Sequence, residues 1–208
     1  MSIPKIIHQV WVGPKPMSDL MKECVNSWKE KHPDWQHILW DNDKIEGFDF
    51  PEKHLLKLRI NYGMQSDIIR LAVLREYGGV YADTDMRCIK SFDGLIHLPN
   101  HDGFIGKDPY DNNLCNSLIA AKKPAKFLDI MLKKIAKSDL SKDGFKETLD
   151  LTGPLFLNQM VRQYFINKVK IFPGKYFNGD KTGSGFYCIH YYTGSWINDI
   201  RCVNKNKG

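Results

Sequence analysis

The stretch QSDIIRLAVLREYGGVYADTD, residues 65–85, decides the fold. Residues 65–77 are apolar around most of a helical circumference, and the pattern predicts a buried helix with Ser66 as its N-cap. Two glycines follow, where a left-handed backbone ends helices. Residues 80–82 then predict a short strand that runs directly into Asp83-Thr84-Asp85. Polar residues at the carboxyl end of a strand are typical of α/β proteins, which bind ligands at that edge of the sheet.

The two aspartates of this triplet are candidate metal ligands. Carboxylates one residue apart can both reach one cation if the backbone turns between them, whereas in a regular strand they share a face. Such oxygen ligands suit Mg²⁺ or Mn²⁺ and leave coordination positions for phosphate oxygens. An isolated Asp-x-Asp is common on solvated loops, but here it follows an apolar helix, two glycines and Tyr81. That setting favours carboxylates that face a cleft.

Asp67 and Arg70 lie three residues apart in the predicted helix and therefore share one of its faces. In one interpretation they form an intrahelical ion pair worth a few tenths of a kcal/mol. In the other, Asp67 accepts hydrogen bonds from sugar hydroxyls while Arg70 binds a hydroxyl, a phosphate or the neighbouring carboxylates. The residues alone leave both interpretations open.

The rest of the chain alternates strand and helix patterns and predicts an α/β fold in one domain spanning residues 1–208, with residues 204–208 disordered. The predicted strands cover residues 3–12, 36–40, 80–82 and 186–193, and the predicted helices cover residues 65–77, 125–137, 155–165 and a segment capped by Ser18. A polar turn at residues 41–43 ends the second strand.

Composition bounds the function. The 208 residues are 42% hydrophobic and 12% aromatic, as expected of a globular protein with a real core. The net charge of +6 comes from scattered lysines, which favours an anionic ligand but not nucleic acid, because no arginine-rich helix accompanies them. The five cysteines indicate neither a disulfide framework nor a zinc site. Without an apolar run of ~18 residues or a signal-peptide pattern, we expect a cytoplasmic protein with at most peripheral membrane contact.

Several motifs, taken in order, resemble glycosyltransferase family 32, the Asp-x-Asp sugar-binding-region glycosyltransferases. That family includes fungal Golgi mannosyltransferases and the catalytic domains of large glucosylating toxins. The resemblance spans nearly the whole chain, and its most specific part is the SD-x-x-R segment followed by GG-x-Y-x-D-x-D. The motifs are IPKIIHQVW (residues 3–11), SDIIR (66–70), GGVYADTD (78–85), TGP (152–154) and HYYTGSW (190–196).

The resemblance implies a GT-A fold, with a mixed, mostly parallel central sheet flanked by helices, and retention of configuration at the anomeric carbon. It makes Asp85 the principal metal ligand, places Trp11 on the base of a nucleotide-sugar donor, and implies a catalytic role for Arg70, Asp83 and Asp85. His190 is a further candidate ligand, although the toxins have a carboxylate and a serine near that place. The donor-binding residues implied are Trp11, Ser66, Asp67, Arg70, Tyr81, Asp83, Asn116, Ser195 and Trp196, and the metal ligands are Asp83, Asp85 and His190.

We therefore expect a Mn²⁺- or Mg²⁺-dependent hexosyltransferase that moves a sugar from a nucleotide-diphospho-sugar, with a UDP-linked donor favoured, to a glycan or glycolipid acceptor. An aspartate-dependent phosphohydrolase is one alternative, although Arg87 stands where those enzymes carry threonine or valine. A catalytically silent glycan- or nucleotide-binding module is the other. His8, near the centre of the first predicted strand, is interpreted as structural. The oligomeric state, the sugar and the acceptor are left open.

Overall fold

Six strands form a mixed sheet in the order β2-β1-β3-β6-β5-β7 in the computed structural model, which describes residues 2–58, 60–142, 144–179 and 185–197. β1 is parallel to both β2 and β3, β5 is parallel to β7, and β6 is antiparallel to both of its neighbours. A second, two-stranded sheet pairs β4 with β8. The strands are β1 (Ile6–Val10), β2 (Gln36–Trp40), β3 (Gly79–Ala82), β4 (Met86–Cys88), β5 (Gly103–Lys107), β6 (Leu114–Ala121), β7 (Val169–Phe172) and β8 (Cys188–His190).

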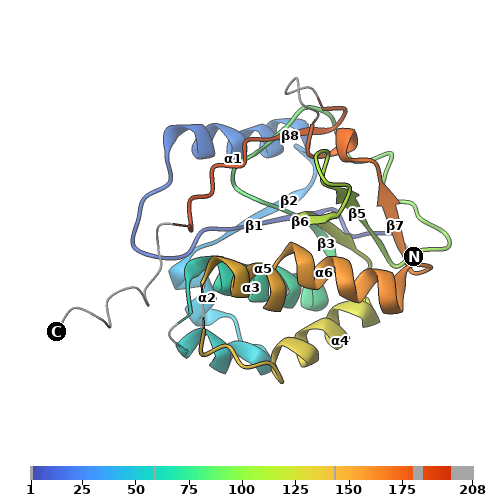
Figure 1. Cartoon of the computed structure of the whole chain (residues 1–208). Coiled ribbons are helices and arrows are strands. Elements are labelled where there is room, and N and C mark those ends of the chain that lie inside the picture. The colour runs from blue at the N-terminus through green and yellow to red at the C-terminus, as the bar shows by residue number, and fades with distance from the viewer. Residues whose placement is uncertain (1, 59, 143, 180–184, 198–208) are drawn as a thin grey trace.

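Helices cover both faces of the large sheet. Figure 1 shows α1 on one face, together with β8, and α3, α4, α5 and α6 on the other. The helices are α1 (Asp19–Lys31), α2 (Asn42–Gly47), α3 (Tyr62–Tyr77), α4 (Lys126–Ile135), α5 (Phe145–Leu151) and α6 (Pro154–Met160), with 3-10 turns at Pro51–Lys57 and Gly174–Tyr176 and a π turn at Val161–Phe165. The predicted α/β fold, with a mixed, mostly parallel sheet flanked by helices, is confirmed.

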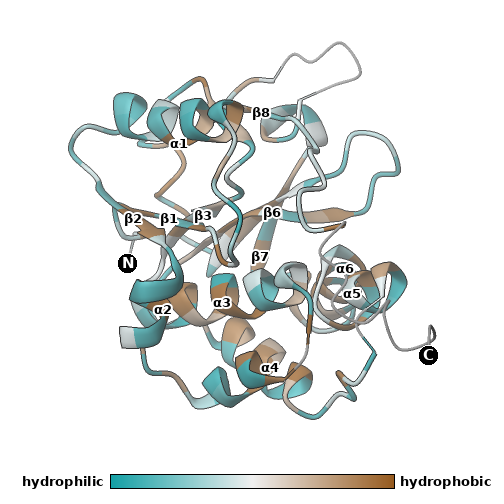
Figure 2. Ribbon diagram, turned by 90° about the vertical axis from the view of Figure 1, so that its left-hand side faces the viewer, coloured by the Kyte–Doolittle hydropathy of each residue, from teal (hydrophilic) through white to brown (hydrophobic). Residues whose placement is uncertain are grey.

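A separate hydrophobic core lies on each face of the sheet. Trp28 of α1 packs with Ile7 and Phe104 on one face, while Met64 and Ile68 of α3 belong to the larger core on the other. Figure 2 shows α3 and α4 on the same side of the sheet, with many hydrophobic residues in both helices. Burying a side chain of this size contributes about 1.5–3 kcal/mol, so α3 is a central element of the fold.

Several predicted boundaries were wrong by a few residues. α3 begins at Tyr62 because Asn61, rather than Ser66, is its N-cap and accepts a hydrogen bond from Met64 N at 2.9 Å. The strand predicted over residues 3–12 is shorter (β1), and of residues 186–193 only Cys188–His190 form a strand. The polar turn at residues 41–43 opens α2 instead, with Asp41 as its cap. The expected disorder of residues 204–208 lies outside the described residues.

The junction between α3 and β3 requires glycine. Gly78 ends α3 with a φ of 66°, and Gly79 has a φ of 99°. A Cβ on Gly79 would lie 2.5 Å from the backbone oxygen of Ile6. The missing side chain therefore lets β3 pair closely with β1 and places Asp83 directly beyond the edge of the sheet.

The connections around β1 create a crevice at this edge. β2 and β3 lie on opposite sides of β1, and the helices that precede them, α1 and α3, cover opposite faces of the sheet. At such a reversal of strand order the connections diverge and leave a crevice beyond the carboxyl ends of the strands. Trp11 follows β1 and Asp83 follows β3 at this point.

His8 lies in the core between these elements. Its Nδ1 accepts a hydrogen bond from Trp40 Nε1 at 3.1 Å, so Nε2 carries the hydrogen and donates to Gly78 O at 2.9 Å. Burial lowers the pKa of His8 to about 4, which keeps the ring neutral near pH 7. This arrangement is that of a structural residue. Among the described residues, no helix is both long and apolar enough to cross a membrane.

Candidate active site

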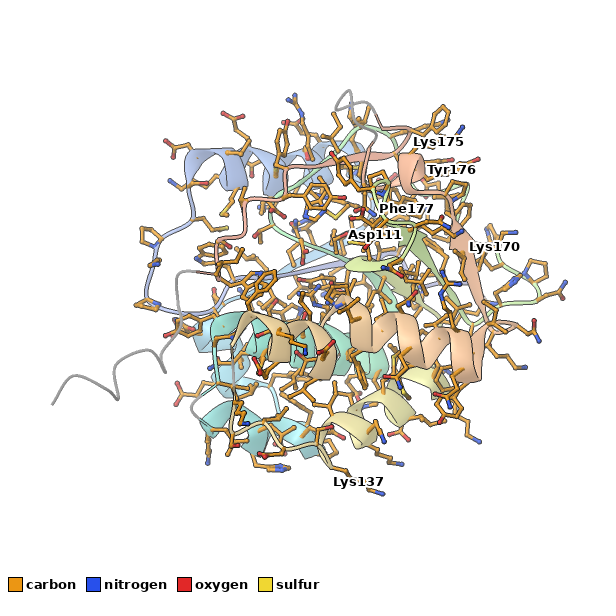
Figure 3. The ribbon with its side chains drawn as sticks, in the orientation of Figure 1. Asp111, Lys137, Lys170, Lys175, Tyr176 and Phe177 are labelled. Atoms are coloured by element: carbon orange, nitrogen blue, oxygen red, sulfur yellow. The ribbon has the colours of Figure 1, made fainter. Side chains whose placement is uncertain are left out.

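A cavity of about 560 Å³ opens at the crevice between β1 and β3. Its volume falls within the range of small-molecule binding sites, roughly 300–1,000 Å³. Asp111, which lines it, is labelled in Figure 3 between the layer that holds α1 and the layer that holds α5 and α6. The structure brings every site residue predicted from the sequence to the wall of this cavity: Trp11, Ser66, Asp67, Arg70, Tyr81, Asp83, Asp85, Asn116, His190, Ser195 and Trp196.

Arg70 is at the centre of a buried polar network. Its Nη2 lies 3.0 Å from Asp67 Oδ1, and its Nη1 lies 3.2 Å from Asp83 Oδ1 and donates to Asn116 O at 2.7 Å. Its guanidinium also lies over the ring of Tyr81, 4.5 Å from the centroid. Burial opposes the charge, but the carboxylates outweigh it and raise the pKa of Arg70. In this geometry Arg70 holds α3, β3 and β6 together, in addition to forming the helical ion pair with Asp67.

Asp67 is buried and fully hydrogen-bonded. Asn116 Nδ2 donates to its Oδ1 at 2.8 Å, and Thr152 Oγ1 donates to its Oδ2 at 2.9 Å. Burial raises the pKa of Asp67 to about 6, despite the attraction of Arg70. Burial also raises the pKa of Asp83, whose Oδ1 accepts a hydrogen bond from Tyr81 OH at 2.7 Å.

Asp85 is held by the last residue of β8 and by the segment that follows this strand. Its Oδ1 lies 3.3 Å from His190 Nε2, and its Oδ2 accepts hydrogen bonds from the backbone N–H and the hydroxyl of Thr193, both at 2.9 Å. Burial favours the neutral carboxyl, but these partners outweigh it and lower the pKa of Asp85 to about 2. His190, in turn, is stacked on Tyr192 with 3.9 Å between ring centroids.

Asp83, Asp85 and His190 form the cluster best suited to a metal ion, since one ligand atom from each lies within 4.8 Å of the others. Two carboxylates and an imidazole are ligands that Mn²⁺ accepts, and carboxylate oxygens also suit Mg²⁺. The charges that line the cavity agree with a cation site, because among the described residues five carboxylates outnumber the two permanent cations, Lys15 and Arg70. The carboxylates are those of Asp67, Asp83, Asp85, Asp108 and Asp111. Within the part of the chain that the structure describes, no hydrogen-bond partner is found for the buried Nδ1 of His190. The cluster therefore fits a divalent cation.

Aromatic side chains form the outer walls of the cavity. Trp196 stacks face to face on Phe145 of α5, with ring centroids 5.6 Å apart and an interplanar angle of 9°. Its ring also covers Gly63, where a Cβ would lie 2.7 Å from it. Trp11 also lines the cavity, and its Nε1 donates to Lys15 O at 2.8 Å, which fixes the ring at the end of β1. Both tryptophans thus add aromatic surface to the wall of the cavity.

Sequence reasoning missed Thr152 and Thr193, which bind the carboxylates of Asp67 and Asp85. Both lie in motifs that carried the resemblance, TGP and HYYTGSW, and this was the available signal. Their partners are 85 and 108 residues away in sequence, so no local pattern indicates the contacts.

The fold is the GT-A fold of glycosyltransferases. Among solved structures, the PaToxG glycosyltransferase aligns with a TM-score of 0.59 over 78% of this chain and 69% of that chain, at 23% identity. The UDP-bound glycosyltransferase domain from the YGT toxin aligns with a TM-score of 0.55 over 82% of this chain and 80% of that chain, at 12% identity.

The sequence comparisons are more specific. Residues 18–102 match the family described as glycosyltransferase sugar-binding region containing DXD motif, and the Asp83-Thr84-Asp85 triplet lies within the match. The resemblance to glycosyltransferase family 32 predicted from the motifs is confirmed, and the chain is a relative of the DXD glycosyltransferases.

Two curated relatives illustrate the range of this group. Subversion of eukaryotic traffic protein A of Legionella pneumophila is 28% identical over 210 residues, which cover 77% of this chain and 32% of that protein. Inositol phosphoceramide mannosyltransferase 1 of Schizosaccharomyces pombe is 29% identical over 206 residues, which cover 93% of this chain and 62% of that protein. The chain thus spans about a third and about three fifths of the lengths of these two relatives.

Proposed function

We propose that the chain is a retaining, metal-dependent glycosyltransferase that moves a hexose from a nucleotide-diphospho-sugar to a hydroxyl of a glycan or glycolipid. The observation that carries this proposal is the meeting of Asp83, Asp85 and His190 in a cavity at the β1–β3 crevice, next to the Asp67–Arg70 pair. A UDP-linked donor is favoured because one solved structure with this fold contains UDP. The mannosyltransferase among the relatives supports a hexose and a glycolipid acceptor.

Asp83, Asp85 and His190 would hold Mn²⁺ or Mg²⁺. There the ion would supply Lewis-acid stabilisation of the negative charge on a diphosphate leaving group, an effect worth several kcal/mol. Tyr81 and Arg70 fix the Asp83 carboxylate, and Thr193 fixes that of Asp85, so both oxygens are oriented in advance. Groups that are oriented in advance toward developing charge supply a large part of the rate enhancement of many enzymes.

The remaining wall residues are assigned to the donor. Trp11 provides a flat surface for the base, and Ser195 and Trp196 supply further parts of the cavity wall. Asp67 and Asn116, already hydrogen-bonded to each other, offer acceptor and donor atoms for sugar hydroxyls. We propose attack by the acceptor hydroxyl on the face from which the nucleoside diphosphate leaves, with the departing phosphate taking the proton. Positioning is then the main contribution of the protein.

Replacing Asp85 with asparagine tests the proposal. With Mn²⁺ and a panel of UDP- and GDP-sugars, we expect wild-type protein to hydrolyse or transfer at least one sugar, and Asp85→Asn to lose at least ~100-fold of that activity, as with loss of a key electrostatic group. EDTA should have the same effect on the wild type. Circular dichroism must show that the variant is folded. Full activity of folded Asp85→Asn would contradict the metal site.

Two alternative functions give different results in the same assays. A phosphohydrolase would release inorganic phosphate from an aryl phosphate. A silent binding module would bind UDP with Mn²⁺, detected by tryptophan fluorescence, but mass spectrometry would find no product from any sugar of the panel.

A further inference from the structure

Two buried cysteines face each other across the small β4–β8 sheet. Cys88 and Cys188 are directly opposite in its antiparallel register, and both are free thiols. They are 2% and 0% exposed, respectively. They lie one hundred residues apart in sequence, so the pairing is a product of the fold.

The backbone hydrogen bonds show which kind of pair this is. Ile89 N donates to Tyr187 O at 2.8 Å, and Tyr191 N donates to Asp85 O at 3.1 Å. Hydrogen-bonded and non-hydrogen-bonded pairs alternate along an antiparallel ladder, so the Cys88 pair, one step from Ile89, is non-hydrogen-bonded. The N–H of Cys88 donates to Ser27 Oγ of α1 at 2.8 Å and not to the opposite strand, as expected at a non-hydrogen-bonded pair.

This kind of pair suits a disulfide. Opposite residues of a non-hydrogen-bonded pair have Cα atoms about 4.5 Å apart and side chains that approach closely. Disulfides occur at Cα separations of roughly 4.4–6.8 Å. The Cys88 thiol now donates to Lys90 O at 3.4 Å, so its side chain must turn from this carbonyl toward Cys188 to form the bridge. A bridge needs rotation of the side chains and little movement of the backbone.

We propose that Cys88 and Cys188 form an oxidisable pair, closed to a disulfide by a small-molecule disulfide such as oxidised glutathione and reopened by thiol reductants. The Cys88 sulfur attacks the oxidant, forms a mixed disulfide and releases one thiol. The Cys188 sulfur, on losing its proton, then attacks Cys88 and releases the second thiol. The two cysteines lose two electrons, which reduce the oxidant to two thiols.

The oxidant reaches the pair when the small sheet opens. β4 and β8 have three residues each, and two-stranded sheets of this size are marginally stable on their own. Local opening of such weakly held segments is far more frequent than global unfolding. We therefore expect the bridge to form slowly under native conditions, without denaturant.

The bridge would join two strands that adjoin the cavity. β4 begins one residue after Asp85, and β8 ends at His190. Because the bridge closes a loop of about one hundred residues, it would also restrict the unfolded chain strongly. It would form whether or not the chain is a transferase, so its test is separate from that of the proposed function.

Peptide mapping of the wild-type chain tests the inference directly. The protein is incubated with oxidised glutathione, its remaining thiols are alkylated, and it is digested with trypsin without reduction. Cleavage after Arg87, Lys90, Lys181 and Arg201 isolates Cys88 in residues 88–90 and Cys188 in residues 182–201. We expect these two peptides to be linked, and the link to disappear with dithiothreitol. We also expect the oxidised protein to melt roughly 5–15 °C above the reduced protein.

Two variants serve as controls. Cys188→Ala should lose both the linked peptide and the rise in Tm, whereas Cys24→Ala, which removes a buried thiol of α1, should keep both. Recovery of residues 88–90 as the alkylated, unlinked peptide after prolonged native oxidation would overturn the inference. So would a native bridge from Cys88 to Cys115 or Cys202. The mapping uses unmodified protein, so it decides the matter even if a variant fails to fold.

Discussion

Replacing Asp67 with asparagine removes a buried charge without leaving a buried polar group unpaired. The asparagine carbonyl can accept the bonds that Asn116 and Arg70 now donate to Oδ1. Its NH₂ group can donate to the hydroxyl of Thr152, which accepts as readily as it donates. The variant therefore isolates the cost of the negative charge itself.

The size of that cost follows from the pKa of Asp67, which burial raises from 3.8 to about 6. The folded protein binds a proton at such a carboxyl more tightly than the unfolded chain does. Its contribution to the free energy of unfolding is therefore complete below the unfolded pKa and is lost as the pH rises through the folded pKa. At 1.36 kcal/mol per pKa unit, the loss is about 3 kcal/mol at pH 8 and about half of that at pH 5. We expect Asp67→Asn to be more stable than the wild type by these amounts.

Urea unfolding followed by tryptophan fluorescence at pH 5 and pH 8, in the presence of EDTA, measures the difference. Asp150→Asn is the matched control, because it changes the net charge equally on an exposed side chain and should shift stability by less than about 0.5 kcal/mol. If Asp67→Asn is less stable than the wild type at pH 8, or if its gain does not depend on pH, the argument from burial is wrong. If the proposed function holds, the same variant loses binding of the nucleotide-sugar.

Three further changes test other parts of the structure. Folding lowers the pKa of His8 from 6.5 to about 4, so between these pH values the unfolded chain binds a proton at His8 that the folded chain does not. As the pH falls through this window, the free energy of unfolding of the wild type should decrease by about 3 kcal/mol relative to that of His8→Gln, measured by urea unfolding. Phe145→Ala removes the ring stacked on Trp196, and should weaken UDP binding by roughly 2- to 10-fold in a fluorescence titration, whereas Tyr164→Ala on an exposed site should not. Gly79→Ala, with a φ of 99° and no room for a Cβ, should lower the free energy of unfolding by at least about 2 kcal/mol; an unchanged Tm would contradict this packing.

Local signals in the sequence predicted β1, α1, β2, α3 and β3 at their places in the chain, but not α2 or β4. Ser18 caps α1 by accepting from Met21 N at 3.3 Å, as its position before an amphipathic segment indicated. By contrast, β5 and β6 were not predicted, because both of their faces are buried and the apolar–polar alternation that marks a half-buried strand is absent. Ser66 was mistaken for a cap because it stands at the start of the apolar run. The first turn of α3 lies before that run and contains Tyr62 and Gly63.

The positions of the site residues followed from the resemblance, but their interactions did not. All eleven predicted residues line one cavity, whereas their roles toward a ligand stay predictions. The helical spacing of Asp67 and Arg70 indicated their ion pair, yet nothing local indicated that Arg70 also bonds Asp83 and the carbonyl of Asn116. Those contacts join α3 to strands that are distant in sequence, and a single sequence carries no signal for them.

The order of the strands has a consequence for how the protein is made. β7, the last strand of the large sheet, ends at Phe172, but His190 and Thr193, which hold Asp85, come later in the chain. A ribosome therefore releases every strand of the large sheet before it releases the residues that complete the candidate metal cluster. During synthesis, the nascent protein can therefore bury its large sheet before His190, the imidazole of the candidate metal cluster, has left the ribosome.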